Sequence, residues 1–207
     1  GVIERRLEAI ENLGSNDILC TDKTGTLSTG EIVLEEVTGP DGKPSERARH
    51  AAYLNAALET GIENPLDAAI VAFGEAAGIS VGNWRKLAEI PYDFTRRRLT
   101  IVIERPSEPL RHRLICKGAF AEVLAICTAE EIGGKRRSLT AARRKQLERL
   151  FQDRSEAGYR VLAVAERQFE AKPSYCREDE SDLVLTGLLL FLDPPKPQAE
   201  KALQDLA

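Results

Sequence analysis

The sequence lacks the features that mark membrane-spanning and secreted chains. Its 207 residues include no methionine, even at the first position, and no signal peptide. No apolar run approaches the roughly 20 residues that cross a bilayer. The longest run, from Leu183 to Leu192, is followed by Asp193 and two prolines. We therefore expect a soluble, monomeric piece of a larger protein, and any membrane helices of that protein would lie outside this piece.

Cysteine usage and net charge exclude further classes. The four cysteines form no Cys-x-x-Cys pair, so a zinc site is not indicated and free thiols in a reduced cytosolic compartment are expected. The net charge of −4 provides no overall positive field for nucleic acid or for an anionic membrane. With 43% hydrophobic and 30% charged residues, the composition is that of an ordinary globular protein.

The order of apolar patterns and turn residues predicts an α+β fold. Helices are expected after Ser45, Asn64 and Thr140, which can cap a first turn, and from Gly118 to Cys127. Strands are predicted at 31–37, 87–92, 99–104, 113–116, 160–166 and 183–192. Because the middle strands do not alternate regularly with helices, we expect an antiparallel sheet with helices packed on it.

The two ends of the chain differ from this middle part. Apolar spacing predicts a helix over 2–13, a strand over 17–21 and a helix from residue 197. Each end thus offers a strand and a helix, so the ends can pair as one partial α/β domain. We place its segments at residues 1–30 and 187–207, with the α+β domain, residues 31–186, inserted between them.

The segment from Asp22 to Leu27, Asp-Lys-Thr-Gly-Thr-Leu, follows the predicted strand over 17–21. A carboxylate at a strand tip can attack phosphorus and form an aspartyl-phosphate. The adjacent Lys23 can offset charge on the transferred group. Thr24 and the glycine after it allow hydroxyl and backbone groups to approach phosphate and its metal ion. The plainer alternative is an acidic loop after a strand.

Two further constellations suit an adenine nucleotide. Phe94 precedes three arginines at 96–98, so a ring that can stack on a base lies beside groups that bind phosphate. A solvated hairpin tip would have the same composition. Lys117 and Gly118 lie between a predicted strand and a helix, where free backbone N–H groups attract anions. The alternative is a surface lysine at a strand end.

Two single residues complete the set. Arg160 opens a buried strand, so its side chain could reach into a cleft or extend to water. Asp67 lies in the first turn of a helix, where the helix dipole favours an acid. It could also accept a hydrogen bond from the amino group of a base.

Taken in order, these motifs resemble the P-type cation-transporting ATPases. The order is the phosphorylation loop, a helix with an acidic residue, Phe with basic residues, Lys-Gly-Ala, Gly-x-Arg-x-Leu-Ala and Asp-Pro-Pro, and the match covers essentially the whole chain. The stretches 92–98, 178–183 and 191–196 are similar to the bacterial magnesium-transporting members. The resemblance implies an ATP-binding piece of an enzyme that couples ATP hydrolysis to transport of a cation, magnesium by this similarity.

The resemblance also implies roles for the reacting end of the nucleotide. Asp22 would take the γ-phosphoryl group of ATP, assisted by Lys23 and Thr24, and Asp22 and Thr24 would hold Mg²⁺. Arg160 would contact phosphate. Arg97 would take the place of the second lysine of the family's pocket.

The remaining roles concern the base and the parent protein. By the same resemblance, Phe94 stacks on adenine, Lys117 with Gly118 lies at the back of the adenine pocket, and Asp67 lies near the adenine amino group. The partners would be the remaining phosphorylation, actuator and transmembrane domains of the parent, at the cytoplasmic face of a cell membrane.

Two observations limit this interpretation. The later motifs of the family, Thr-Gly-Asp and Gly-Asp-Gly-x-x-x-Asp, do not occur, so this piece is expected to bind ATP with little or no turnover. A soluble phosphatase with an Asp nucleophile is a rival, but it would usually carry a second Asp where Thr24 stands. A non-catalytic adenine-nucleotide-binding module is the other rival, and it would not need Asp22.

Overall fold

The computed structural model describes residues 22–61 and 64–199. They form two compact units, a larger one from Ile32–Leu192 and a smaller one from the segments on either side of it. The boundary at residue 192 differs from the expected one at 186, because the last strand of the larger unit continues to Leu192. The predicted helix over 2–13 and strand over 17–21 lie outside the described residues.

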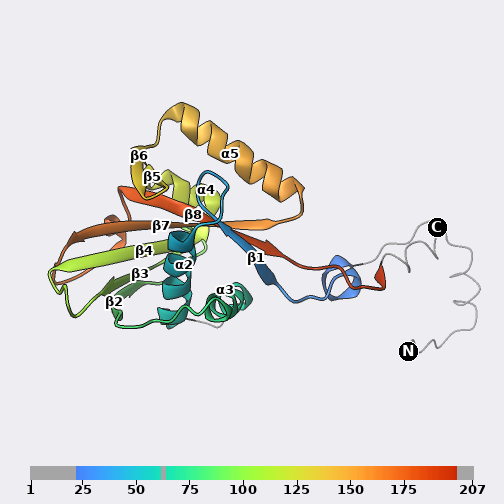
Figure 1. Ribbon diagram of the computed structural model, residues 1–207, viewed down its shortest axis with the longest axis horizontal. Helices are drawn as coiled ribbons and strands as arrows, with labels where there is room; N and C mark the ends of the chain where they lie inside the picture. Colours follow the sequence, from blue (N-terminus) through green and yellow to red (C-terminus); the bar gives the residue numbers. More distant parts are fainter. Residues whose placement is uncertain (1–21, 62–63, 200–207) are drawn as a thin grey trace, which may run out of the picture. The chain divides into compact units, whose positions relative to one another are not determined.

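The larger unit is built on one eight-stranded sheet, drawn in Figure 1. Its strands are β1 (Val33–Thr38), β2 (Arg85–Ile90), β3 (Arg98–Glu104), β4 (Arg111–Ala119), β5 (Cys127–Ile132), β6 (Lys135–Ser138), β7 (Arg160–Glu170) and β8 (Leu183–Leu192). Their order is β2-β3-β4-β7-β8-β5-β6, and β1 also pairs with β8. The neighbours are antiparallel except β5 and β8, so the predicted α+β class is confirmed for a sheet with one parallel pair.

Four helices of this unit are α2 (Glu46–Leu58), α3 (Pro65–Ala76), α4 (Phe120–Ala125) and α5 (Ala141–Glu156). The predicted caps are confirmed, since the side chains of Ser45, Asn64 and Thr140 each accept a backbone N–H of the first turn. The prediction that Gly118 opens a helix was wrong. Gly118 is paired within β4, and the short α4 starts two residues later.

The helices cover both faces of the sheet. Figure 1 shows α2 and α3 on one face and α4 with α5 on the other. Alternate residues of β3 separate the two cores, with Ile101 and Ile103 packed toward α2 and α3 and Val102 packed toward α4 and α5. Among the described residues, no helix is both long enough and apolar enough to cross a membrane.

Antiparallel pairing brings three predicted site segments to one end of this sheet, here called the turn end. The turn formed by residues 91–97 lies between β2 and β3 and so precedes the start of β3. Gly118 of β4 is opposite Arg98, and Ala119 is opposite Leu162 of β7. The start of β3, the end of β4 and the start of β7 therefore lie side by side.

Candidate functional site

A buried group of charges at the turn end joins three elements on the α2–α3 face. Lys117, on β4, donates a hydrogen bond through Nζ to Oδ1 of Asp67 in the first turn of α3. The same Nζ is 3.6 Å from Oε2 of Glu59, the residue that follows α2. The Lys117 side chain is only 5% exposed. We call Lys117, Asp67 and Glu59 the lysine cluster.

The lysine cluster contains one more carboxylate than ammonium groups. Burial and, to a smaller extent, the neighbouring Asp67 carboxylate raise the pKa of Glu59 to about 7, against the opposing effect of Lys117. Within the described part of the chain, Oε2 of Glu59 has no hydrogen-bond partner. A buried acceptor of this kind is costly unless a donor reaches it. The cluster can therefore accept a hydrogen bond from a ligand.

A cavity of about 680 Å³ opens beside Asp67 and Glu59. Small apolar side chains form much of its remaining wall: Ala56, Ala68, Val71 and Ala72. An apolar wall with a few polar groups at fixed positions is the usual composition of a small-molecule site. A flat base that carries an amino group matches this combination of an apolar wall and carboxylate acceptors.

The turn over residues 91–97 presents an aromatic side chain to solvent. Phe94 is 90% exposed, and its ring meets Tyr92 edge-on with centroids 5.7 Å apart. Exposure of a whole phenylalanine ring has no packing benefit for the free protein, so it marks a candidate contact surface. The Asp93 carboxylate accepts the backbone N–H groups of Thr95 and Arg96, and the Arg96 N–H bond is the main cause that lowers the pKa of Asp93.

The same turn is packed directly against the end of β4. Arg97 has a left-handed backbone with φ of 46°, and its carbonyl accepts the N–H of Ala119 at 2.9 Å. A Cβ on Gly118 would lie 2.6 Å from Cα of Arg98 and would also overlap the Arg97 carbonyl oxygen. Glycine is needed here because the two backbones approach closely. The Arg97 guanidinium is exposed and pairs with Glu122 of α4 at 3.3 Å.

Arg160 is exposed at the first residue of β7, opposite Phe191 of β8. It thus lies at the same end of the sheet as Gly118. The structure brings Asp67 and Lys117 into contact and packs Arg97 against Gly118. It puts Phe94 and Arg160 on segments of that end, and among the described residues neither side chain forms a hydrogen bond or ion pair with the lysine cluster.

The smaller unit contains the other predicted residues. Asp22 is exposed and precedes a single helical turn, η1 (Lys23–Leu27). The Asp193 carboxylate accepts hydrogen bonds from Ser28 Oγ at 2.6 Å and from the Gly30 N–H at 3.1 Å. The segment after β8 is therefore fastened to the segment after Asp22. The side chains of Lys23 and Thr24 lie outside the described part of the chain.

The fit of a magnesium ion rests on Asp22. A carboxylate oxygen is a ligand that Mg²⁺ prefers, and the ion usually adds water and substrate phosphates to one or two such ligands. Within residues 22–61 and 64–199, no group of three or more His, Cys, Asp or Glu side chains is arranged to hold a metal ion. Asp22 thus fits as a partial ligand set for an ion that arrives with a phosphate.

Sequence reasoning missed Glu59, although a signal for it exists. Glu59 directly follows the last residue of α2, and the carboxyl end of a helix disfavours a negative charge. An acid at such a position is worth examining as a partner for a buried cation, and here that cation is Lys117.

Comparisons with known proteins agree with the order of motifs. A family model described as "P-type ATPase, cytoplasmic domain N" matches residues 51–198. Over 99% of the chain, the sequence is 43% identical to the "Magnesium-transporting ATPase, P-type 1" of Escherichia coli K12 and 44% identical to the protein of that name in Salmonella typhimurium 14028s. A calcium-transporting ATPase of Listeria monocytogenes is 27% identical over 98% of the chain. The chain spans about a quarter of the length of each, 23% of the magnesium-transporting proteins and 25% of the calcium-transporting one.

Proposed function

The chain belongs to the P-type ATPases, to their cytoplasmic domain N, and from this premise we propose that its larger unit binds ATP at the turn end of the sheet. The base would enter the cavity beside Asp67 and Glu59, with its amino group directed to those carboxylates. Phe94 would stack on the base, as exposed aromatic rings do on nucleobases. Arg97 and Arg160 would meet the phosphates.

The observation that carries this proposal is the unmatched acceptor of the lysine cluster. Glu59 Oε2 is buried, 3.6 Å from the Lys117 ammonium, and has no hydrogen-bond partner among the described residues, and Glu59 is one of the residues that line the cavity of about 680 Å³. The exposed ring of Phe94 belongs to the same end of the sheet. An apolar cavity lined by carboxylates, together with an exposed aromatic ring at the same end of the sheet, suits an adenine base better than a sugar or a bare anion.

For the parent protein we propose an aspartyl-phosphate on Asp22 and coupling of ATP hydrolysis to cation transport. Two relatives that cover 99% of this chain are named as magnesium-transporting, which supports magnesium as the transported ion. A bound Mg²⁺ would neutralise charge on the transferred phosphoryl group. Asp22 would supply one oxygen ligand and Thr24 a second. The Asp22 carboxylate would attack the γ-phosphorus of ATP, and the bond from that phosphorus to the bridging oxygen would break to release ADP.

Calorimetric titration of ATP against Phe94→Ala tests the site in the larger unit. Loss of base stacking, about 1–3 kcal/mol per base, should weaken binding roughly tenfold or more. Leu110→Ala is the matched control, because Leu110 is another exposed apolar side chain, 78% exposed, in the loop at the opposite end of β3 and β4. Equal affinities for Phe94→Ala and Leu110→Ala would overturn the assignment of Phe94.

The phosphate contacts are tested by comparing two ligands. Arg160→Ala should weaken ATP more than adenosine, because a guanidinium binds phosphate through charge-assisted hydrogen bonds that adenosine cannot form. Equal losses for both ligands would indicate that Arg160 has only a structural role at the start of β7.

Phosphorylation is tested in the full-length parent. Asp22→Asn keeps the shape of the side chain but removes the attacking charge, so no acid-stable label should remain after incubation with γ-labelled ATP. ATP binding to the larger unit should be unaffected. Label retained by Asp22→Asn would refute the assignment of Asp22 as the nucleophile. It would not contradict the proposed ATP site in the larger unit.

A further inference from the structure

A second buried group of charges lies on the face of the sheet opposite the lysine cluster. Its centre is the carboxylate of Glu180, whose side chain is fully buried. Arg96 donates to both of its oxygens at 2.7 and 2.6 Å, Arg98 Nε donates at 2.9 Å and Thr100 Oγ1 at 2.7 Å. We call Glu180, Arg96, Arg98 and Thr100 the arginine cluster.

The arginine cluster connects two distant parts of the chain. Glu180 follows a single turn, η2 (Arg177–Asp179), in the connection between β7 and β8. Arg96 belongs to the turn that carries Phe94, 84 residues earlier. Its guanidinium also donates to the Pro91 carbonyl at 2.5 Å and pairs with Asp93, so it fastens the turn internally as well as to Glu180.

Packing alone cannot fix the position of the Phe94 ring. The ring is 90% exposed, and Tyr92, the ring it touches, is itself 49% exposed. The direction of Phe94 therefore depends on the backbone of residues 91–97. Each nitrogen of the planar Arg96 guanidinium has its own partner: Nη1 donates to both oxygens of Glu180, Nε to Asp93 and Nη2 to the Pro91 carbonyl. This fixes the backbone of the turn at a set angle, which an apolar contact would not do.

Glu180 does not reach the cavity itself. Thr100, which it contacts, points to the face that carries α4 and α5, because neighbouring residues of β3 alternate between faces. Lys117 points to the other face with Ile115, toward α2 and α3. A carboxylate held behind the sheet can act on a ligand in the α2–α3 cavity only through the turn that it fastens.

We propose that Glu180 is a positioning residue for nucleotide binding, which holds the turn over residues 91–97 so that Phe94 and Arg97 face the ligand. This inference rests on the proposed function. Breaking a buried ion pair leaves the remaining charges unmatched. Loss of the Glu180 charge therefore loosens the turn while the lysine cluster and the cavity stay intact.

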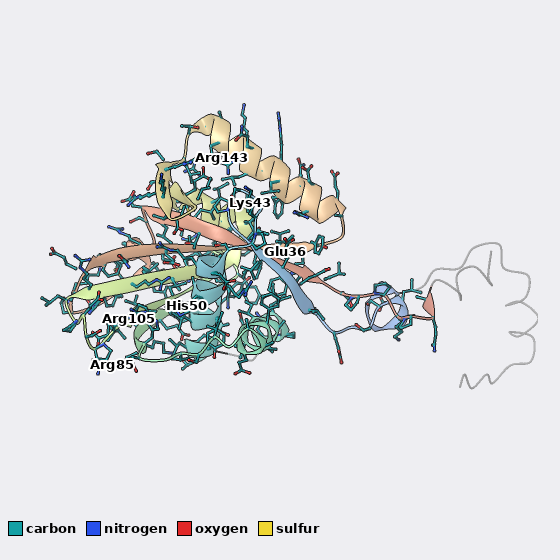
Figure 2. All side chains as sticks on the ribbon, in the orientation of Figure 1. Glu36, Lys43, His50, Arg85, Arg105 and Arg143 are labelled. Atoms are coloured by element: carbon teal, nitrogen blue, oxygen red, sulfur yellow. The ribbon has the colours of Figure 1, made fainter. Side chains whose placement is uncertain are left out.

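The test uses Glu180→Gln in this chain, with Glu166→Gln as the matched control. Glu166 is also a buried carboxylate, 2% exposed, and it accepts two hydrogen bonds from Arg113 at 2.8 and 2.6 Å. Among the described residues, no hydrogen bond or ion pair joins that pair to the turn. Arg113 is opposite Ile103, near the end of β3 that is marked by Arg85 and Arg105 in Figure 2.

Two measurements on each folded variant decide the matter. Hydrogen exchange of peptides covering residues 91–100 should accelerate in Glu180→Gln and stay unchanged in Glu166→Gln. ATP affinity should fall about tenfold in Glu180→Gln alone, the loss expected if a tenth of the molecules hold the competent turn. Should Glu180→Gln fail to fold, Thr100→Val removes one hydrogen bond to the same carboxylate and should give a smaller change in the same direction.

The double variant Phe94→Ala/Glu180→Gln separates positioning from general destabilisation. If Glu180 acts through the turn, the double variant loses less ATP affinity than the two single losses added together. Additive losses, or equal losses in Glu180→Gln and Glu166→Gln, would overturn the inference. If residues 91–100 exchange faster in Glu180→Gln but the unsubstituted chain binds no ATP, the proposed function is refuted. The role of Glu180 in holding the turn would still stand.

Discussion

The lysine cluster and the arginine cluster lie on opposite faces of the sheet, on the neighbouring strands β4 and β3, yet their charges are matched to different degrees. Around Glu180, two guanidinium groups and a hydroxyl supply four hydrogen bonds to one carboxylate. Around Lys117, one ammonium group meets two carboxylates, and one oxygen of Glu59 has no hydrogen-bond partner among the described residues.

This difference separates a group that fixes geometry from a group that can bind. A fully satisfied buried network has no capacity left for a ligand and mainly specifies one arrangement of the chain. A partly satisfied one holds a free-energy cost that a suitable donor would relieve. The satisfied arginine cluster lies behind the sheet, and the partly satisfied lysine cluster lies beside a cavity. Together they provide a rigid support and a group that can bind a ligand.

The substitution with the largest expected effect on stability removes the single cation of the lysine cluster. Lys117→Met leaves the Asp67 and Glu59 carboxylates buried together, which should cost about 3–5 kcal/mol of unfolding free energy near pH 8. Urea unfolding near pH 8 and near pH 6 measures the cost, which should shrink at the lower pH as a carboxylate takes up a proton. The control Lys86→Met breaks a less buried pair with Glu89 and should cost under about 1 kcal/mol. Equal costs for both variants would contradict the account.

A second test disturbs the contact between the turn and β4, which lies between the two clusters. In Gly118→Ala the new Cβ would lie 2.6 Å from Cα of Arg98, so the turn must move. Overpacking of this kind costs about 1–3 kcal/mol. Thermal unfolding measures the cost, and Gly61→Ala is the control, because a Cβ at Gly61 meets nothing within 4 Å. A loss in Gly61→Ala as large as that in Gly118→Ala would show that close packing is not the cause.

The sequence predicts local structure well where a cap or a strong apolar run defines it. Ser45, Asn64 and Thr140 mark three helix starts, and the run from Leu183 to Leu192 matches β8 residue for residue. The hairpin of β5 and β6 was missed because β6, Lys135–Ser138, is polar and exposed throughout. The adjacent Gly133 and Gly134 are a hairpin signal that was available.

The candidate site was only partly predictable, for a physical reason. The order of motifs pointed to Asp67 and Lys117, and these two side chains are in contact. Glu59 came from no motif, and Glu180 was given no role although it lies in the stretch 178–183, because their partners are 58 and 80 to 84 residues away in the sequence. Pairing over such separations is decided by the strand order, which local patterns do not contain.

A third test changes the charge balance of the lysine cluster without changing its shape. The pKa of Glu59, about 7, lies above the ordinary 4.5, so the folded chain keeps a proton that the unfolded chain loses between these values. The stability that this proton contributes is complete below about pH 4.5 and is lost as the pH rises through about 7. Glu59→Gln should therefore stabilise the chain near pH 8 by on the order of 1 kcal/mol and have little effect near pH 5.

Urea unfolding of both proteins from about pH 5 to about pH 8 measures this dependence. Glu46→Gln is the control, because Glu46 is 80% exposed and should leave the profile unchanged. A pH profile of Glu59→Gln that parallels the unsubstituted chain would show that Glu59 is not the titrating group.

The smallest expected effect concerns Arg97, which belongs to the turn and pairs with Glu122, outside both clusters. Arg97→Gly relieves a left-handed backbone, worth about 1–2 kcal/mol, but loses about 0.5–1 kcal/mol to glycine entropy and about 0.2–1 kcal/mol from the exposed pair with Glu122. These contributions nearly cancel, so the unfolding free energy should change by no more than about 0.5 kcal/mol. Arg97→Ala is the matched variant, because it also lacks the guanidinium but keeps the strain. If ATP affinity falls equally in both, the guanidinium contacts the ligand. If it falls only in Arg97→Gly, the rigidity of the turn is what matters, and Arg97 joins Glu180 among the residues that hold Phe94 in place.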